Sequence, residues 1–318
     1  MTKVLVTGGA GYVGSVLIPK LLDKGYKVRC FDNLMYKEPT LLTSCMNKNF
    51  EFVKGDIRNY DEVEKAVKDM DIIIHLSAIV GFPACKKDPR YARDVNYYGT
   101  VNVERARNPT HQKLIFASTG SVYGAIHYDI GETAKGICTE EYPPAPLTEY
   151  GKTKLEAENA IVRSDNWVIY RYATGFGLSP RMRLDLMPND FTYQAVKNKL
   201  LVVYEKKFRR TFIHVRDMAE SYLFALKNFA KIRDEIYNVG SEKMNFTKED
   251  IANIVKNFVD YNLIYAETGK DPDKRDYEVS YEKIRKKGFE TKIDMKEGIR
   301  ELIKGYQMVD IMKPYSNA

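Results

Sequence analysis

The chain has 318 residues, of which 44% are hydrophobic and 29% charged, and it carries a formal net charge of +7. This length accommodates one large domain or two lobes, and the composition excludes disordered and fibrous proteins. Because basic residues are mixed with acidic ones along most of the chain, as in DKRDYE, the positive charge does not predict a nucleic-acid partner.

Signals for membranes, export and metal binding are not found in this sequence. The longest apolar stretch, residues 72–83, is interrupted by His75 and Gly81 and falls well short of the ~20 residues that a membrane span needs. The amino terminus, MTKVLVTGG, lacks the pattern of a signal peptide. We therefore expect a cytoplasmic protein with no membrane partner and no metal. The cysteines, expected as reduced thiols because they lie far apart without zinc-ligand spacing, are Cys30, Cys45, Cys85 and Cys138.

In the first half, short runs of β-branched and aromatic residues alternate with segments whose apolar residues recur at helical spacing. Strands followed by helices in this order form a parallel sheet that is covered on both faces. We therefore predict an α/β fold with a Rossmann-type, doubly wound parallel sheet. The expected strands cover residues 3–9, 26–32, 50–56, 71–78 and 113–118, and the expected helices cover residues 12–25, 60–70 and 92–106.

The second half begins with a helix at 148–163 and a strand at 166–172, and its pattern then loosens around Pro180 and Pro188. We predict one domain over residues 1–173 and a smaller lobe over 174–318, parts of which return to the main sheet. The further expected elements are helices at 191–199 and 217–229 and strands at 209–215 and 235–240.

The first strand runs directly into TGGAGYVGS, in which Gly8, Gly11 and Gly14 are spaced three residues apart. Glycines here allow a tight turn and let a diphosphate approach the backbone at the N-terminus of the next helix. A turn without a ligand is the alternative for a glycine triplet alone. Asp32 ends the second strand, where a carboxylate accepts hydrogen bonds from an adenosine ribose, and Asp56 follows the third strand near the expected adenine. Together they favour NAD over NADP, so we expect residues 1–173 to form an NAD-binding domain and residues 174–318 to form a substrate-binding lobe.

Two groups of polar residues are candidates for an active site. The strand in LIFASTGSVYG, residues 114–124, ends on the hydroxyl side chains of Ser118, Thr119 and Ser121, which line either a site or an ordinary turn. In the helix EYGKTKLEAE, Tyr150 and Lys154 are four residues apart and share one face. A nearby ammonium favours the phenolate, so this pair is able to exchange a proton with a sugar hydroxyl while a nicotinamide exchanges hydride. Taken alone, a tyrosine and a lysine at this spacing far more often reflect ordinary surface packing, and the glycine-rich turn and the hydroxyl-ended strand are what favour a site.

In this order, the motifs resemble the NAD-dependent epimerase/dehydratase family of extended short-chain dehydrogenases, typified by UDP-galactose 4-epimerase. Members of this family act on nucleotide-diphosphate sugars, and the resemblance implies such a substrate, NAD as cofactor and a homodimer. The matching stretches are TGGAGYVGS, FDNL, GDIRN, HLSA, VNYYGT, STGSVYG, YGKTKLEAE, RYATGFG, RRTFIHVRDMAE and IYNVGS.

The resemblance also implies residue roles. Thr119 would hydrogen-bond the reacting sugar oxygen, Tyr150 would act as the acid and base, and Lys154 would lower the pKa of the tyrosine and hold the nicotinamide ribose. The expected cofactor-binding residues are Gly8, Gly11, Tyr12, Val13, Gly14, Asp32, Asn33, Asp56, Ile57, Leu76, Ala78, Asn96, Ser118, Tyr150, Lys154 and Tyr172. The expected substrate-binding residues are Val80, Thr119, Ser121, Thr174, Arg181, Arg183, Asn189, Arg210 and Arg275.

Two departures from the epimerase pattern concern the substrate. RYATG replaces RYFNP, so Thr174 stands where an asparagine normally contacts the substrate. The stretch LSPRMRLDLMPNDFTYQA also differs, and with VGFPACKKDP and DPDKRDYEVS it is closer to bacterial GDP-manno-heptose 4-dehydrogenases of surface-polysaccharide synthesis. The nucleotide base and the sugar are therefore left open.

The residues that follow Thr119 reduce the number of possible reactions. A 4,6-dehydratase has Asp-Glu there to eliminate water, whereas Gly120 and Ser121 are unable to do this near neutral pH. A 4-epimerase, which we favour, a 4-dehydrogenase and a 4-ketoreductase share the same catalytic residues and stay open. A non-catalytic NAD-binding regulator would predict a damaged Tyr/Lys pair, but both residues are intact.

Overall fold

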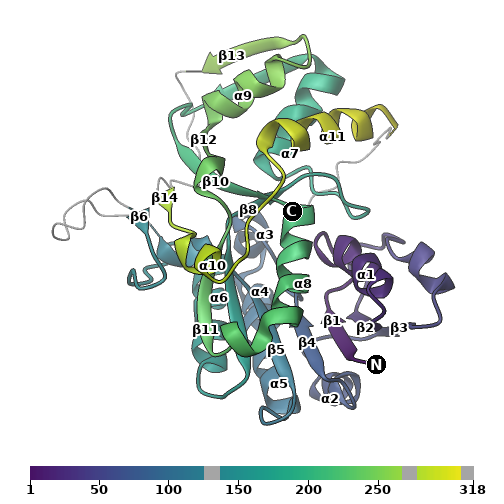
Figure 1. Cartoon of the computed structure of the whole chain (residues 1–318). Coiled ribbons are helices and arrows are strands. Elements are labelled where there is room, and N and C mark those ends of the chain that lie inside the picture. Colours follow the sequence, from purple (N-terminus) through teal and green to yellow (C-terminus); the bar gives the residue numbers. More distant parts are fainter. Residues whose placement is uncertain (125–136, 267–277, 309–318) are drawn as a thin grey trace.

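A parallel sheet forms the lower body of the computed structural model, which describes residues 1–124, 137–266 and 278–308 (Figure 1). Its seven strands follow the order β11-β7-β5-β4-β1-β2-β3, and every neighbouring pair is parallel. The strands are β1 (Lys3–Thr7), β2 (Lys27–Asp32), β3 (Phe50–Lys54), β4 (Ile72–His75), β5 (Lys113–Thr119), β7 (Trp167–Tyr172) and β11 (Glu235–Val239). The predicted doubly wound α/β fold is confirmed.

Helices cover both faces of this sheet because alternate strand residues supply an apolar side chain to each face. On one face, Val4, Val6 and Ile115 pack with α1 and α8, while Leu5 and Phe116 pack on the other face with α2, α5 and α6. The helices of the lower body are α1 (Gly14–Asp23), α2 (Tyr60–Val67), α3 (Phe82–Lys87), α4 (Pro89–Arg93), α5 (Gly99–Ala106), α6 (Glu149–Ile161), α8 (Val215–Ile232) and α10 (Glu282–Lys286).

The helix expected at 92–106 consists of three pieces. The end of α4 continues through a π-helical segment, Asp94–Tyr98, into α5, which ends at Ala106 as expected. The π-helical segment carries Asn96, whose side chain lies buried against α6 through Thr153. A π-helical turn within an α-helix often lies near a functional site.

The upper lobe has its own apolar core, formed by residues such as Phe176, Phe212, Ile251 and Leu302 (Figure 1). One of its sheets has the order β12-β10-β8 and a second pairs β13 with β9, whereas β14 and β6 form a short sheet whose buried residues, Cys138 and Val279, pack with the core of the lower body. The strands are β6 (Ile137–Cys138), β8 (Thr174–Phe176), β9 (Leu200–Tyr204), β10 (Arg209–His214), β12 (Asn245–Thr247), β13 (Asn262–Ala266) and β14 (Glu278–Val279), and the helices are α7 (Met187–Tyr193), α9 (Lys248–Lys256) and α11 (Met295–Met308).

The chain passes between the two parts more than once. It leaves the main sheet after β7, forms β8, α7, β9 and β10 in the upper lobe, and returns through α8 to β11. β11 then pairs with β7 along its whole length, from Glu235 opposite Val168 to Val239 opposite Tyr172. The predicted boundary after residue 173 therefore lies between β7 and β8, and α8 and β11 beyond it belong to the lower body.

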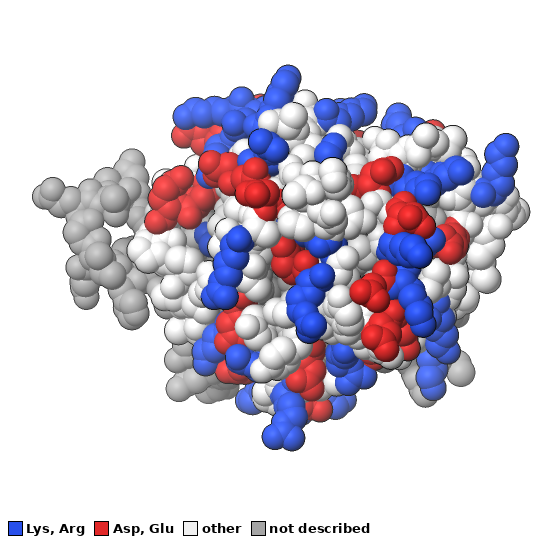
Figure 2. Space-filling model, turned by 90° about the horizontal axis from the view of Figure 1, so that it is seen from below, with Lys and Arg blue, Asp and Glu red and all other residues white. Residues whose placement is uncertain are grey.

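Charges on the face seen from below are of both signs and are interspersed (Figure 2). Many of the basic side chains in the described ranges form ion pairs, such as Arg29 with Glu51 and Lys283 with Glu235. None of the helices described in the structure is both long and apolar enough to cross a membrane.

Candidate active site

A cavity of about 280 Å³ lies at the edge of the main sheet where the parallel strands end. The register of the sheet brings these ends together, because Thr7 is opposite both Phe31 and His75, and Thr119 is opposite Tyr172. The upper lobe contributes residues such as Arg181 to the same cavity. In open parallel sheets, ligands bind in the crevice outside the carboxyl ends of the strands.

Most of the predicted site residues line this one cavity. They come from eight separate segments of the printed sequence, so the fold rather than proximity along the chain brings them together. The predicted residues that line it are Gly8, Gly11, Tyr12, Val13, Gly14, Asp32, Asn33, Asp56, Ile57, Leu76, Ala78, Val80, Ser118, Thr119, Ser121, Tyr150, Lys154, Tyr172, Thr174, Arg181 and Arg183.

The glycine-rich turn has the backbone geometry of a diphosphate cradle. Gly8 has φ +68°, and a Cβ atom there would lie 2.7 Å from the amide nitrogen of Ser77. A Cβ atom on Gly14 would lie 2.5 Å from the Cα of Gly9, so a side chain at either glycine would force the backbone to move. The turn leads into the N-terminus of α1 and lines the cavity, leaving amide groups and the positive end of the helix dipole for a phosphate.

Asp32 is held with its carboxylate at the cavity. One oxygen accepts a hydrogen bond from the amide of Ala10 at 3.0 Å, and the other accepts one from the amide of Leu34 at 2.8 Å. Burial raises the pKa of Asp32, and the two amide groups lower it. An acidic residue in this position suits a ribose with free hydroxyls and disfavours a 2′-phosphate, so the residues present fit NAD.

Asp56 lies at the same end of the cavity and forms an ion pair with Arg58 at 2.8 Å. The hydrogen bond from the Arg58 side chain lowers the pKa of the Asp56 carboxyl group, which burial raises to a smaller extent. Asp56 is thus already paired on one side, and the adjoining Ile57 is buried against the helix face of Gly99.

The hydroxyl groups at the end of β5 have different environments. The Thr119 hydroxyl donates to Ser121 Oγ at 3.1 Å and accepts from the Ser121 amide at 3.1 Å, and both side chains line the cavity. Ser118 also borders the cavity, but its hydroxyl donates to the carboxylate of Glu158. Tyr123 is buried and donates to Asn238 Oδ1 at 2.6 Å, in line with a structural role.

Tyr150 and Lys154 are presented by α6. Thr148 caps this helix, because its hydroxyl accepts a hydrogen bond from the Gly151 amide at 3.1 Å. Both Tyr150 and Lys154 line the cavity, and the Lys154 ammonium lies 4.1 Å from the centre of the Phe116 ring. Burial lowers the pKa of Lys154 to about 7, and the nearby Glu158 carboxylate opposes this shift.

Lys154→Met should stabilise the ligand-free protein in a pH-dependent way. Between about pH 7 and pH 10.5 the folded protein binds fewer protons at Lys154 than the unfolded chain does, so the cost of burying this lysine falls as the pH rises. The gain in free energy of unfolding is therefore expected to be largest below pH 7 and to fade toward pH 10.5. Urea unfolding of wild type and variant at several pH values measures it.

The matched control is Lys152→Met, because Lys152 lies on the same helix with a side chain that is half exposed. Its effect on the free energy of unfolding should not vary with pH over that window. If the curves of Lys154→Met and wild type run parallel with pH, the buried lysine does not have the depressed pKa.

A buried ion pair joins α6 to the main sheet close to Lys154. Arg171 of β7 donates to both carboxylate oxygens of Glu158, at 2.7 and 3.1 Å, and the two side chains are 3% and 2% exposed. Arg171 also donates to the Tyr123 hydroxyl at 3.2 Å. Because Glu158 lies one helical turn after Lys154 and accepts from Ser118, this pair joins α6 to β5 and β7.

Asn96 and Asn189, predicted as direct contacts of the cofactor and the substrate, do not line the cavity. Asn96 is fully buried and bonds the Ile79 amide at 2.7 Å and the Thr153 hydroxyl at 3.1 Å. Asn189 is also fully buried, with bonds to the Gly177 amide at 2.8 Å and the Arg183 carbonyl at 2.9 Å. The structure thus gives both side chains protein partners, and their contacts with the cofactor and the substrate stay predictions. These side chains have their hydrogen-bonding groups satisfied by the protein, and they hold loops that border the cavity.

Arg210 lies beside the main cavity, not within it. It lines a recess of about 30 Å³ together with Thr119, Ser121 and Thr174. The recess shares Thr119, Ser121 and Thr174 with the main cavity, so Arg210 lies next to residues that line both. Arg275 lies outside the described residues.

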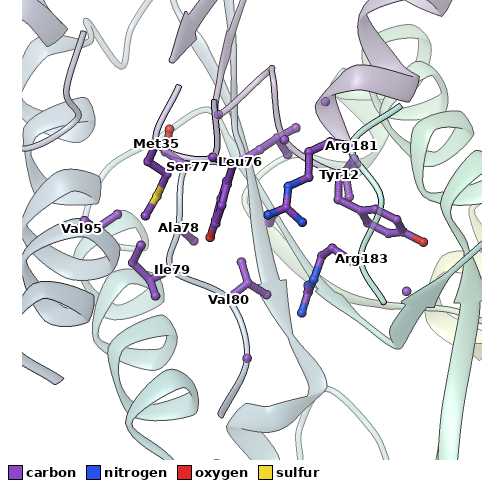
Figure 3. A pocket seen from close by; sticks show the side chains of 18 of the residues that line it. Tyr12, Met35, Leu76, Ser77, Ala78, Ile79, Val80, Val95, Arg181 and Arg183 are labelled. Atoms are coloured by element: carbon purple, nitrogen blue, oxygen red, sulfur yellow. The ribbon is translucent and has the colours of Figure 1, made fainter. Parts of the chain in front are cut away.

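Arg181 and Arg183 reach into the cavity from the side opposite Ala78, Ile79 and Val80 (Figure 3). The Arg183 guanidinium donates to both oxygens of Asp185, at 3.2 and 2.5 Å. The side chain of Tyr12 points away from the cavity in the same view, and its hydroxyl donates to the Gly177 carbonyl at 2.8 Å. Tyr12 therefore contributes its backbone to the cradle and its side chain to the junction with the upper lobe.

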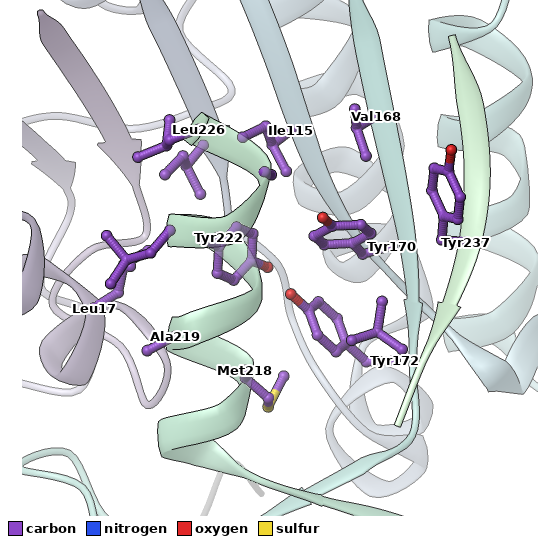
Figure 4. Packing of buried hydrophobic residues seen from close by; sticks show 14 of the residues in the cluster. Leu17, Ile115, Val168, Tyr170, Tyr172, Met218, Ala219, Tyr222, Leu226 and Tyr237 are labelled. Carbon is purple, nitrogen blue, oxygen red and sulfur yellow. The ribbon is translucent and has the colours of Figure 1, made fainter. Parts of the chain in front are cut away.

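Some cavity residues were not among those predicted. One of them is Tyr222 of α8, which lies against the predicted Tyr172. Both belong to a cluster of buried tyrosines that extends to Tyr170 and Tyr237 (Figure 4). The alternation in DMAESYLFALKNF marks a helix but does not distinguish a cavity-facing tyrosine from a core residue. The other cavity residues missed include Met35, Tyr36, Glu38, Phe82, Tyr91, Thr148 and Met218.

Comparison with known sequences gives matches over nearly the whole chain. The model of the NAD dependent epimerase/dehydratase family matches residues 4–240. A Methanocaldococcus jannaschii protein with the provisional name UDP-glucose 4-epimerase is 30% identical over 312 residues, which span 94% of this chain and 97% of that protein.

Solved structures with the same fold include two epimerases. The UDP-glucose 4-epimerase of Thermus thermophilus in complex with NAD has a TM-score of 0.82 and 26% identity, and the match covers 96% of this chain and 99% of that one. The UDP-glucuronic acid 4-epimerase of Bacillus cereus, in complex with UDP-glucuronic acid and NAD, has a TM-score of 0.82 and 25% identity over the same shares. Both structures contain NAD, which is the cofactor that the glycine-rich turn and Asp32 predict for this chain.

Proposed function

Because the chain belongs to the NAD-dependent epimerase/dehydratase family, we propose that it is a 4-epimerase of a nucleotide-diphosphate sugar. The family is NAD-dependent, and this protein is an enzyme of that family with NAD as its cofactor. The observation that supports the proposal most strongly is the convergence of Thr119, Tyr150 and Lys154 on the cavity that the glycine-rich turn also lines.

The proposed roles follow from the positions of these side chains. Tyr150 takes the proton of the sugar C4 hydroxyl and returns it when the 4-keto sugar is reduced, and Thr119 hydrogen-bonds the same oxygen. Lys154, with a pKa lowered to about 7 by burial, supplies positive charge near the phenol and holds the cofactor ribose. When bound here, NAD supplies the hydride acceptor for oxidation and the hydride donor for its reversal.

Loss of water from the sugar is disfavoured by the groups around Thr119. Elimination across C5 and C6 needs an acid and a base beside the reacting carbons. The residues that follow Thr119 are Gly120 and Ser121, and the Ser121 side chain is a hydroxyl hydrogen-bonded to Thr119. Neither provides a carboxyl group, which argues for chemistry confined to C4.

A second candidate is a 4-dehydrogenase or 4-ketoreductase that acts on a sugar such as a GDP-linked heptose. It is favoured by the cavity residues that depart from the epimerase pattern, namely Thr174, Arg181 and Arg183. In that case the 4-keto sugar leaves the site or enters it from outside. We further propose that the enzyme works in the cytoplasm as a homodimer, as the resemblance to the family implies.

The proposal is tested by incubating the purified protein with UDP-, GDP-, CDP- and dTDP-linked sugars and following two products together. We expect the C4 epimer of one substrate to accumulate without net formation of NADH. A keto sugar formed in equal amount with NADH would contradict epimerisation and support the dehydrogenase. Conversion to a 4-keto-6-deoxy sugar would contradict the argument from Gly120 and Ser121.

A further inference from the structure

The loop that follows β2 forms an outer wall of the cofactor cavity. Residues 32–38 all line the cavity, while the side chains of Met35 and Lys37 are exposed, so this loop separates the cavity from solvent. Its first residues are fixed by the bonds from the Leu34 amide to Asp32 and from the Met35 amide to Asn33. Its far end is fixed by the Thr40 hydroxyl, which donates to the Ala10 carbonyl at 2.9 Å. Both ends are therefore attached to the cofactor-binding elements.

The middle of this loop contacts the upper lobe through one arginine. The Arg181 guanidinium stacks 3.9 Å from the centre of the Tyr36 ring, and its Nε atom lies 3.7 Å from the Glu38 carboxylate. The Arg181 side chain is 2% exposed and that of Glu38 is 20% exposed. Contacts of this kind are strong when water is excluded from them.

The segment that carries Arg181 is attached to the start of α1. The Ser179 hydroxyl donates to the Tyr12 carbonyl at 2.7 Å and lies 2.9 Å from the Ser15 hydroxyl, and the Arg181 amide donates to Ser179 at 3.3 Å. With the Tyr12 hydroxyl bonded to Gly177, the whole segment follows the glycine-rich turn. The contacts therefore form a closed belt that runs from the glycine-rich turn through the loop after Asp32 to Arg181 and back through Ser179.

We propose that this belt encloses the bound NAD and controls its exchange, with Arg181, Tyr36 and Glu38 as the part that must open. The belt includes the glycine-rich turn before α1, where the cofactor diphosphate would bind. While Arg181 contacts Tyr36 and Glu38, the cofactor would be unable to leave past the loop of residues 32–38. The inference deepens the proposed function and rests on it in one respect. An epimerase must keep the same cofactor through both hydride transfers, whereas a dehydrogenase must release it in every cycle.

The experiment measures exchange of the cofactor without any sugar. Protein loaded with NADH is mixed with excess NAD, and the loss of NADH fluorescence gives the release rate. Binding of NADH to nucleotide-free protein in a stopped-flow instrument gives the association rate. If the belt is a gate, Tyr36→Ala should raise both rates by roughly tenfold and Glu38→Gln both by roughly threefold, leaving the Kd nearly unchanged.

The Glu38→Gln variant distinguishes this proposal from the alternative that Arg181 is only a binding site for an anion. If Arg181 only attracted the cofactor diphosphate, Glu38→Gln would remove a competing carboxylate and slow the release of NADH. Release that is unchanged or slower in both variants, or a faster release with an unchanged association rate, would overturn the proposal. These outcomes are independent of the sugar assay, so a failed gate and a failed epimerase assignment remain distinguishable.

Tyr60→Ala is the matched control. Arg105 lies 4.7 Å from the Tyr60 ring centre, a contact of the same chemical kind, and Tyr60 does not line the cavity. This variant should leave both rates unchanged. Glu38→Gln keeps the shape of the side chain, so the test stands even if Tyr36→Ala lowers the thermal stability.

Discussion

Tyr150→Phe is expected to lower kcat by about a thousandfold, because the variant retains the ring and loses the group that exchanges the substrate proton. The ring lines the cavity from α6, next to Lys154 on the same face of the helix, so the shape of the site should persist. An interaction made only in the transition state lowers kcat and kcat/KM equally. Steady-state kinetics with the substrate found in the sugar screen, together with the affinity for NADH, measure the effect.

Tyr123→Phe is the control for this substitution. Tyr123 comes four residues after Thr119, but its hydroxyl bonds Asn238 and accepts from Arg171 away from the cavity. The control should reduce the thermal stability and leave kcat per folded molecule within about threefold of wild type, since a structural hydroxyl contributes to folding. If Tyr150→Phe retained a tenth or more of the wild-type kcat, another group would have to be the acid and base.

The second large effect is on stability. Arg171→Met leaves the Glu158 carboxylate buried without its cation and should lower the free energy of unfolding by about 3–5 kcal/mol. Because Glu158 lies one turn beyond Lys154 and also accepts from Ser118, kcat should fall as well in the folded fraction. Denaturant unfolding followed by circular dichroism gives the change in free energy.

Two further variants test the physical reason. The double variant Arg171→Met with Glu158→Leu removes both charges and should recover much of the lost stability, since an apolar pair avoids the cost of burying charge. Arg285→Met breaks the ion pair with Glu242, in which both side chains are more than 40% exposed, and should cost less than about 1 kcal/mol. Equal losses from Arg171→Met and Arg285→Met would contradict the importance of burial.

The main sheet could be predicted from local sequence because its strands are short apolar runs, and those at its centre are largely buried. Ile72–His75 and Trp167–Tyr172, for example, are buried at every position. Helical spacing and the glycine triplet then placed α1 and the cofactor turn. From the same patterns we could also predict that Thr119, Tyr150 and Lys154 lie near one another. The ends of the strands and the first turns of the helices that follow them meet at one edge of a parallel sheet.

The parts that were missed depend on contacts between distant residues. The Tyr12 hydroxyl bonds a carbonyl 165 residues further along the chain, and Tyr36 meets Arg181 across the cavity. No local pattern marks such partners. Asn189 illustrates the problem, since whether an asparagine faces a substrate or a buried amide depends on which backbone groups the rest of the fold leaves to be satisfied.

The position of β11 also has a consequence for the order in which the protein forms during synthesis. The ribosome completes β7 long before it reaches Glu235, and until then β7, buried at all six positions in the finished fold, has no neighbour on its outer side. A nascent chain with such an open edge is prone to pair with other strands. Of the upper lobe, only β8, α7, β9 and β10 are synthesised during this interval, so the final closure of the sheet that carries the cofactor cavity waits for the first part of that lobe.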